Sequence, residues 1–251
     1  MNRYVCLVIV MLVSGCAKYV TPGGPAEMRH LGVAGMTEEE RRELTDRSVL
    51  EALDKKPLAA FPTGLAVARV QEPGYESFTN RGYGTGKYSV VTTREAGDEE
   101  HLARLELLPM VKGVAPLGRI LLPAQLDSDL PLRHAAGTLH ADILLIYTVD
   151  TRFQEVGNPQ LANVLLLGHL KDREMVVTST ISAALLDTRN GYVYGIAEGS
   201  ATRRQATSGW NKAEVVDASR RAVESEAMGK LVKDVERVWK GVVEEYATGQ
   251  R

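Results

Sequence analysis

The residue with the clearest chemical potential is Cys16, whose thiol follows the small residues of Val13-Ser14-Gly15. An apolar run over residues 4–13 precedes it, and Arg3 places one positive charge ahead of that run. A basic start, a short apolar run and small residues before a break are the parts of a secretory signal. The run is too short to span a bilayer, which takes about 20 apolar residues. This order predicts export, with a thiol at the cleavage point.

The stretch Val13-Ser14-Gly15-Cys16 resembles the lipobox of bacterial lipoproteins. In that family a diacylglycerol is attached to the cysteine sulfur, and the chain is cut before the cysteine. The resemblance implies a lipoprotein signal peptide over residues 1–15 and lipidation of Cys16. The alternative is a cysteine that happens to follow an ordinary signal peptide. Cys6 would leave with the signal, so a mature chain starting at Cys16 would have no internal disulfide.

The same resemblance bears on where the protein resides. Ala17 and Lys18 follow the cysteine, with no Asp at the second position of the mature chain. In a diderm bacterium this implies sorting to the outer membrane, with the domain facing the periplasm. We therefore expect membrane attachment through the palmitate-bearing lipid on Cys16.

No other residues form a pattern that predicts a catalytic, cofactor or metal site. Zinc sites need converging ligands, and no histidine has a cysteine partner or a second histidine three or four residues away. Gly82-Tyr83-Gly84-Thr85-Gly86 resembles a phosphate loop without the required Lys-Ser/Thr, so a hairpin loop is expected. Trp210 could anchor a partner, but a contact that fixes the start of the last helix is favoured. The scattered histidines are His30, His101, His134, His140 and His169.

Asp150 is the carboxylate most worth testing for catalysis, because it ends the strongest predicted strand. Strand ends often face a cleft. A solvated Asp that caps a turn is the favoured alternative. The acidic groups at residues 38–40 and 98–100 stand where helix starts favour negative charge, which explains them without catalysis.

Composition narrows the class of protein further. The chain has 251 residues, 44% hydrophobic and 25% charged, which is ordinary for a globular protein and excludes a multi-pass membrane protein. With 30 basic against 32 acidic residues and no basic block, nucleic acid is not an expected partner. Residues 16–36 are rich in Gly and Pro and predict a flexible tether. A single α/β domain is expected over residues 37–247.

Hydrophobic periodicity predicts the elements of that domain. The run over residues 141–150 is continuously apolar, so it is expected at the centre of a sheet. Val235, Val238 and Trp239 belong to one apolar face of the last helix, which should pack on the sheet. Helices are predicted over 37–56, 98–108, 127–140 and 214–246, and strands over 64–71, 87–95, 120–122, 141–150, 164–169, 176–186 and 192–201. The fold class is therefore α/β (α+β): one mixed sheet with a C-terminal β-hairpin, packed by helices including a long C-terminal amphipathic helix.

From Gly137 onward the chain carries a pattern found in known envelope proteins. A long strand ends in Leu185-Leu186-Asp187-Thr188-Arg189-Asn190-Gly191, the next begins Tyr192-Val193-Tyr194, and an amphipathic helix follows. This resembles lipoproteins related to the curli secretion channel subunit and to the N-terminal domain of the Tol-system propeller protein. More closely it resembles the rhombotarget lipoproteins, found beside rhomboid-type sorting proteases. These families bring no catalytic residues. The chain lacks the Gly-Gly and apolar tail of the associated sorting substrates, so we do not expect it to be one.

These observations favour a lipid-anchored cell-envelope lipoprotein that serves as a non-catalytic binding or assembly module. Its expected partners are the membrane, through Cys16, and another envelope protein. Two alternatives remain open: a periplasmic enzyme of unknown reaction and a component of an oligomeric secretion pore. For a pore, residues 152–182 could form one hairpin, but the strands do not alternate over the roughly 9–11 residues required.

Overall fold

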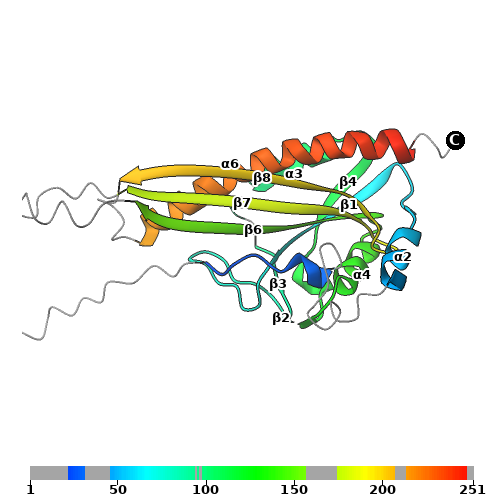
Figure 1. Ribbon diagram of the computed structural model, residues 1–251, viewed down its shortest axis with the longest axis horizontal. Coiled ribbons are helices and arrows are strands. Elements are labelled where there is room, and N and C mark those ends of the chain that lie inside the picture. Colours follow the sequence, from blue (N-terminus) through cyan, green and yellow to red (C-terminus); the bar gives the residue numbers. More distant parts are fainter. Residues whose placement is uncertain are drawn as a thin grey trace, which may run out of the picture.

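The computed structural model describes residues 22–31, 46–93, 95, 98–156, 174–206 and 213–247. Its main feature is a six-stranded mixed sheet in the order β3-β1-β6-β7-β8, with β4 also paired to β1. A second sheet joins β2 to β5. Helices lie on both sides of the main sheet, with α6 along one side and α4 on the other (Figure 1). The predicted fold class is confirmed.

The strands and helices have the following bounds. The strands are β1 (Thr63–Gln71), β2 (Thr85–Gly86), β3 (Ser89–Val91), β4 (Val111–Pro116), β5 (Gln125–Leu126), β6 (Ile143–Val156), β7 (Glu174–Asp187) and β8 (Val193–Ala206). The helices are α2 (Asp46–Asp54), α3 (Asp98–Glu106), α4 (Leu130–Thr138) and α6 (Ala213–Val242), with 3-10 turns η1 (Met28–Leu31) and η2 (Arg119–Leu121) and a π-turn η4 (Val243–Ala247).

Strands β1 and β6 form the centre of the sheet and are parallel to each other. Leu144 and Ile146 face the core under α4, whereas Ile143 and Leu145 face the core under α6. A strand buried on both faces needs a continuous apolar run, because successive side chains point to opposite faces. The prediction that residues 141–150 lie at the centre of the sheet is therefore confirmed.

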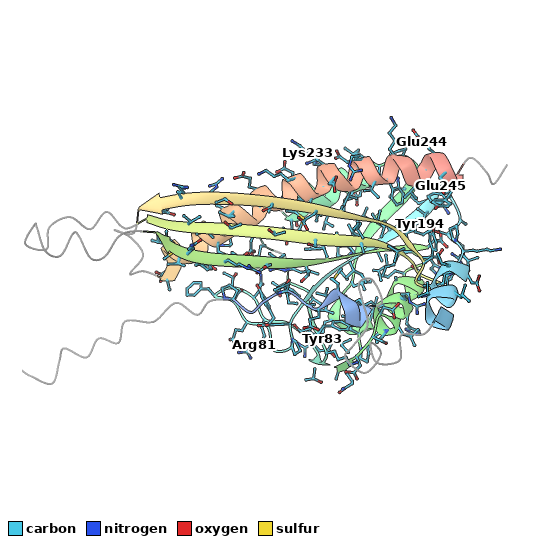
Figure 2. The ribbon with its side chains drawn as sticks, viewed as in Figure 1. Arg81, Tyr83, Tyr194, Lys233, Glu244 and Glu245 are labelled. Carbon is cyan, nitrogen blue, oxygen red and sulfur yellow. The ribbon has the colours of Figure 1, made fainter. Side chains whose placement is uncertain are left out.

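The C-terminal helix α6 covers one face of the sheet. Its side chains Val235 and Trp239 are fully buried in the core between the helix and the sheet, and its Val238 packs against the same core. Gly199 of β8 lies directly under the helix, where a Cβ would overlap the backbone of α6. Figure 2 shows Lys233 on the outer side of α6, as the amphipathic pattern predicts, and Glu244 on the outer side of η4.

Residues 22–31 differ from the flexible tether predicted over 16–36. The amide of Ala26 donates to Thr148 Oγ1 at 2.9 Å, and Leu31 is buried. The side-chain amide of Gln71 accepts from the Val149 amide and donates to the Val149 and Gly24 carbonyls. Hydrogen bonds to fixed partners on the sheet therefore order a segment that buries little apolar surface of its own.

Other boundaries differ as well. Residues 120–122 were expected to form a strand, but η2 occupies residues 119–121, because i→i+3 bonds such as Leu122 N to Arg119 O close a turn there. The strand predicted over 87–95 is reduced to β3. Strands β6 and β8 extend to residues 156 and 206, past their predicted ends. The predicted strand over 164–169 and the helix start at Thr37 lie outside the described residues.

Candidate functional site

A cavity of about 60 Å³ lies between the sheet, α3 and α6. Its walls are mainly aliphatic, and all three elements contribute to them. The periodicity that buries one face of each helix also leaves these side chains facing one another across the cavity. Wall residues include Val67 and Leu145 from the sheet, Leu102 and Leu105 from α3, and Leu231 and Val235 from α6.

Polar side chains interrupt this apolar lining. Arg69 from β1, Tyr147 from β6 and both Asp98 and His101 from α3 line the cavity. Arg69 and Tyr147 also line a second, smaller pocket that reaches Glu224 on α6. Burial raises the pKa of Tyr147, so its hydroxyl stays protonated at neutral pH. We call the cavity and the smaller pocket together the cleft. The cleft combines an apolar interior with a few hydrogen-bonding groups, which is the usual character of a ligand site.

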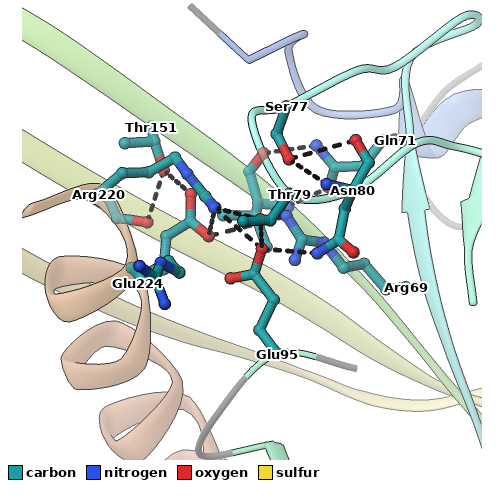
Figure 3. Close-up of polar contacts among 12 residues, drawn as sticks. Arg69, Gln71, Ser77, Thr79, Asn80, Glu95, Thr151, Arg220 and Glu224 are labelled. Carbon is teal, nitrogen blue, oxygen red and sulfur yellow. Dashed lines mark hydrogen bonds and ion pairs between the residues drawn. The ribbon is translucent and has the colours of Figure 1, made fainter. Parts of the chain in front are cut away.

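Next to the cleft, Arg220 is the centre of a buried ion network (Figure 3). Its guanidinium pairs with Asp217 at 3.0 Å, with Glu224 at 2.6 Å and with Glu95 at 2.9 Å. Although burial disfavours the charge of Arg220, these carboxylates raise its pKa and keep it ionised. Thr151 on β6 donates to Glu224. The network therefore fixes α6 to the sheet and to the segment that precedes α3.

Glu95 connects the loop after β1 to this network. Its carboxylate accepts hydrogen bonds from Thr79, Asn80 and Arg220. Burial alone would raise the pKa of Glu95, but the charge and hydrogen bond of Arg220 outweigh burial and lower it. The ionised carboxylate is thus held in place as one wall of the smaller pocket.

Arg69 lies between the network and the cavity. Its Nη2 donates to the Tyr75 hydroxyl at 3.1 Å and lies 3.8 Å from Glu224 Oε2. The guanidinium carbon lies 5.5 Å from the centre of the Tyr75 ring. Burial disfavours its charge, but Glu224 raises the pKa of Arg69 enough to keep it protonated. Arg69 therefore presents a charged donor at the edge of an apolar space.

The residues singled out from the sequence lie elsewhere, apart from His101. Asp150 was expected at a strand end, but it lies within β6, on the sheet face opposite α6, and pairs with Arg152 at 2.8 Å. The expectation was wrong because β6 continues to residue 156. His134 and His140 are exposed. No cluster of metal ligands occurs within the described part of the chain. Cys16, His169, Trp210 and the His30 side chain lie outside it.

The glycine-rich loop over residues 82–86 has a packing role. Gly84 and Gly86 have positive φ values, and a Cβ on either would overlap Leu126 of β5. Gly82 lies against Ser89 in the same way. The glycines allow the loop to run close to neighbouring strands, as expected of a structural loop rather than a phosphate site.

The ion network was not predicted, yet one signal for it exists in the sequence. Arg220 lies on the apolar stripe of α6, between Val216 and Val223, where a charge would be buried. Asp217 and Glu224 stand three and four residues away, at the spacing of intrahelical ion pairs. The partners Glu95 and Arg69 are too distant in sequence to be recognised in this way.

Sequence comparison finds no matching protein-family model and no matching curated protein. Structure comparison finds a single-residue variant of PelC from Paraburkholderia phytofirmans, described as a dodecamer: TM-score 0.36, 14% identity, covering 74% of this chain and 94% of PelC. A minor lipoprotein of Acinetobacter baumannii gives TM-score 0.35 and 10% identity, covering 72% and 94%. A Neisseria meningitidis lipoprotein gives 0.26 and 12%, covering 65% and 99%. Scores this low transfer neither activity nor partner to this chain.

Proposed function

We propose that this chain is a lipid-anchored envelope lipoprotein whose domain binds another envelope protein without catalysing a reaction. The observation that carries the binding role is the cleft between α3 and α6, where an apolar cavity adjoins a rigid ion network. The network's carboxylates are held by Arg69 and Arg220. Carboxylates held in ion pairs in this way give the binding site a defined shape, and they are poorly placed to exchange protons with a substrate.

The Val13-Ser14-Gly15-Cys16 stretch supports the anchor, and the ordered residues 22–31 limit its reach. Six residue steps separate Cys16 from Pro22. A fully extended chain of that length spans at most about 20 Å. A lipid on Cys16 would therefore hold the domain close to the bilayer. Within the described residues, no helix is long and apolar enough to cross a membrane.

A photocrosslinking amino acid at Ser225 tests the binding role. Ser225 lies on the exposed side of α6 and lines the smaller pocket. In intact cells we expect one discrete adduct from this position. The matched control is Leu53 of α2, which is 74% exposed and does not line the cleft. Equal patterns of adducts from both positions, or none from Ser225, would argue against a binding site at the cleft.

A periplasmic enzyme is the second candidate, and one observation favours it. Both ring nitrogens of His101 are buried without a hydrogen-bond partner among the described residues. A histidine inside a cavity could act as a general base. Activity profiling against esters, peptides and glycan fragments tests this, with His101→Phe and Asp150→Asn as variants. A turnover abolished by His101→Phe in a folded protein would replace the binding proposal.

A further inference from the structure

Three buried polar atoms of the cavity lining lack hydrogen-bond partners among the described residues. They are Arg69 Nε and both ring nitrogens of His101. The Arg69 side chain is only 10% exposed, so bulk water does not replace the missing partners. An unpaired buried polar group costs about 1–3 kcal/mol, so a ligand that pairs with these atoms would gain free energy.

The chemistry of these atoms restricts the ligand. Arginine Nε only donates, whereas a neutral imidazole donates from one nitrogen and accepts at the other. A carboxylate or an ester carbonyl could accept but could not donate, and an ammonium group could only donate. An amide offers both a carbonyl oxygen and an N–H. A backbone amide can therefore pair with Arg69 and His101 together, and every protein partner carries such amides.

The charges around the cleft also favour an uncharged ligand. Among the cleft residues that the structure describes, positive charges do not outnumber negative ones, so an anion gains no net attraction from them. Three arginines, Arg69, Arg220 and Arg221, face four carboxylates, Glu95, Asp98, Asp217 and Glu224.

The size of the cavity suits a single aliphatic group. Its volume of about 60 Å³ is well below the roughly 150 Å³ of an engineered cavity that binds benzene. Leu102, Leu105 and Leu231 supply walls without polar atoms. This volume suits a branched side chain of four carbons better than a long acyl chain.

We propose that the cavity between α3 and α6 binds a leucine-like side chain of a partner protein, with the adjoining backbone amide paired to Arg69 and His101. This inference rests on the proposed binding function and specifies what the cleft recognises. The partner residue would supply the apolar group and the amide from one short stretch of chain.

The test follows the Met228 methyl group by NMR in the full chain, held in lipid nanodiscs and labelled with methyl-13C methionine. Met228 lines the cavity, and a Met228→Leu sample distinguishes its signal from those of the other methionines. The probe is N-acetyl-leucine methylamide, which we expect to shift the signal saturably. N-acetyl-alanine methylamide lacks the aliphatic group, and 4-methylpentanoate and its methyl ester lack the amide N–H. We expect weaker binding from all three.

Three variants locate the binding. Leu102→Trp should fill the cavity and abolish the shift, while Leu107→Trp, at a position 84% exposed beyond α3, should leave it unchanged. His101→Phe keeps the ring but removes both nitrogens, and should weaken binding roughly fivefold. No saturable shift, a shift that survives Leu102→Trp, or equal binding of the ester would overturn the proposal; the last result would indicate a lipid ester. If Ser225 still captures a partner in that case, the binding function stands and only the ligand assignment fails.

Discussion

The guanidinium of Arg220 is fully buried among three carboxylates, so replacing it should be costly. Removing one side of a buried ion pair typically costs about 3–5 kcal/mol, because the partner charges stay buried and unpaired. We expect Arg220→Met to lose that much free energy of unfolding in urea titrations. Arg203, 53% exposed and paired with Glu226, provides the control. Arg203→Met should cost under about 1 kcal/mol. Equal losses from both variants would contradict a structural role for the network.

Glu95 gives this network a pH dependence. Arg220 lowers the pKa of Glu95 below its unfolded value near 4.5. A carboxyl whose folded pKa is depressed contributes stability above its unfolded pKa, and that contribution is lost as pH falls through the folded pKa. We expect the free energy of unfolding to fall as the pH drops below the unfolded value of 4.5, and to fall less steeply in Glu95→Gln. Glu106→Gln, at an exposed position on α3, should retain the parent slope. If the free energy of unfolding of Glu95→Gln falls with pH as steeply as that of the parent protein, this carboxyl is not coupled to folding.

Residues that act together are easiest to recognise in a sequence when they are neighbours in the chain. The lipobox residues are contiguous, so Cys16 could be singled out directly. The cleft brings together Arg69, His101 and Tyr147 from three separate elements. Nothing in their spacing marks them, because the sheet register and the packing of α3 place them side by side. In the sequence, His101 is one of five scattered histidines.

Replacing Trp239 measures how much the packing of α6 contributes to the stability of the fold. The side chain is fully buried, and its Nε1 donates to the Pro109 carbonyl at 2.8 Å. Trp239→Ala should reduce the free energy of unfolding by about 3–5 kcal/mol, since it leaves a cavity and an unpaired carbonyl. Leu53→Ala, at a position 74% exposed on α2, should change it by less than about 0.5 kcal/mol. Unchanged melting of Trp239→Ala would mean that α6 does not pack on the sheet in the monomer.

The elements with strong periodicity were predicted well, and those held by irregular hydrogen bonds were not. Strands β6 and β7 and helix α6 each carry a long apolar pattern that one packing arrangement satisfies. Residues 22–31 carry no such pattern and depend on Gln71 and Thr148, which are distant in sequence. Their composition alone predicts a tether. Order arises there because the sheet supplies hydrogen-bond partners in fixed positions.

At the scale of the whole molecule, the ordered residues 22–31 connect the predicted anchor to the domain. They hydrogen-bond to β1 and β6, the central strands whose other face lies under α6. A lipid on Cys16 would therefore limit how far the domain can lie from the bilayer. The proposed partner would then be an envelope protein that presents its binding segment near the membrane surface.

The most direct test of this central claim is labelling of intact cells with a palmitate analogue, followed by membrane fractionation. We expect the parent protein to be labelled and to partition with membranes, and Cys16→Ser to lose the label. Cys6→Ser is the matched control, because Cys6 lies within the predicted signal and should not carry the lipid. Its label and membrane partition should match the parent. A Cys16→Ser protein that still takes up the label and remains with the membranes would contradict lipid anchoring at this cysteine.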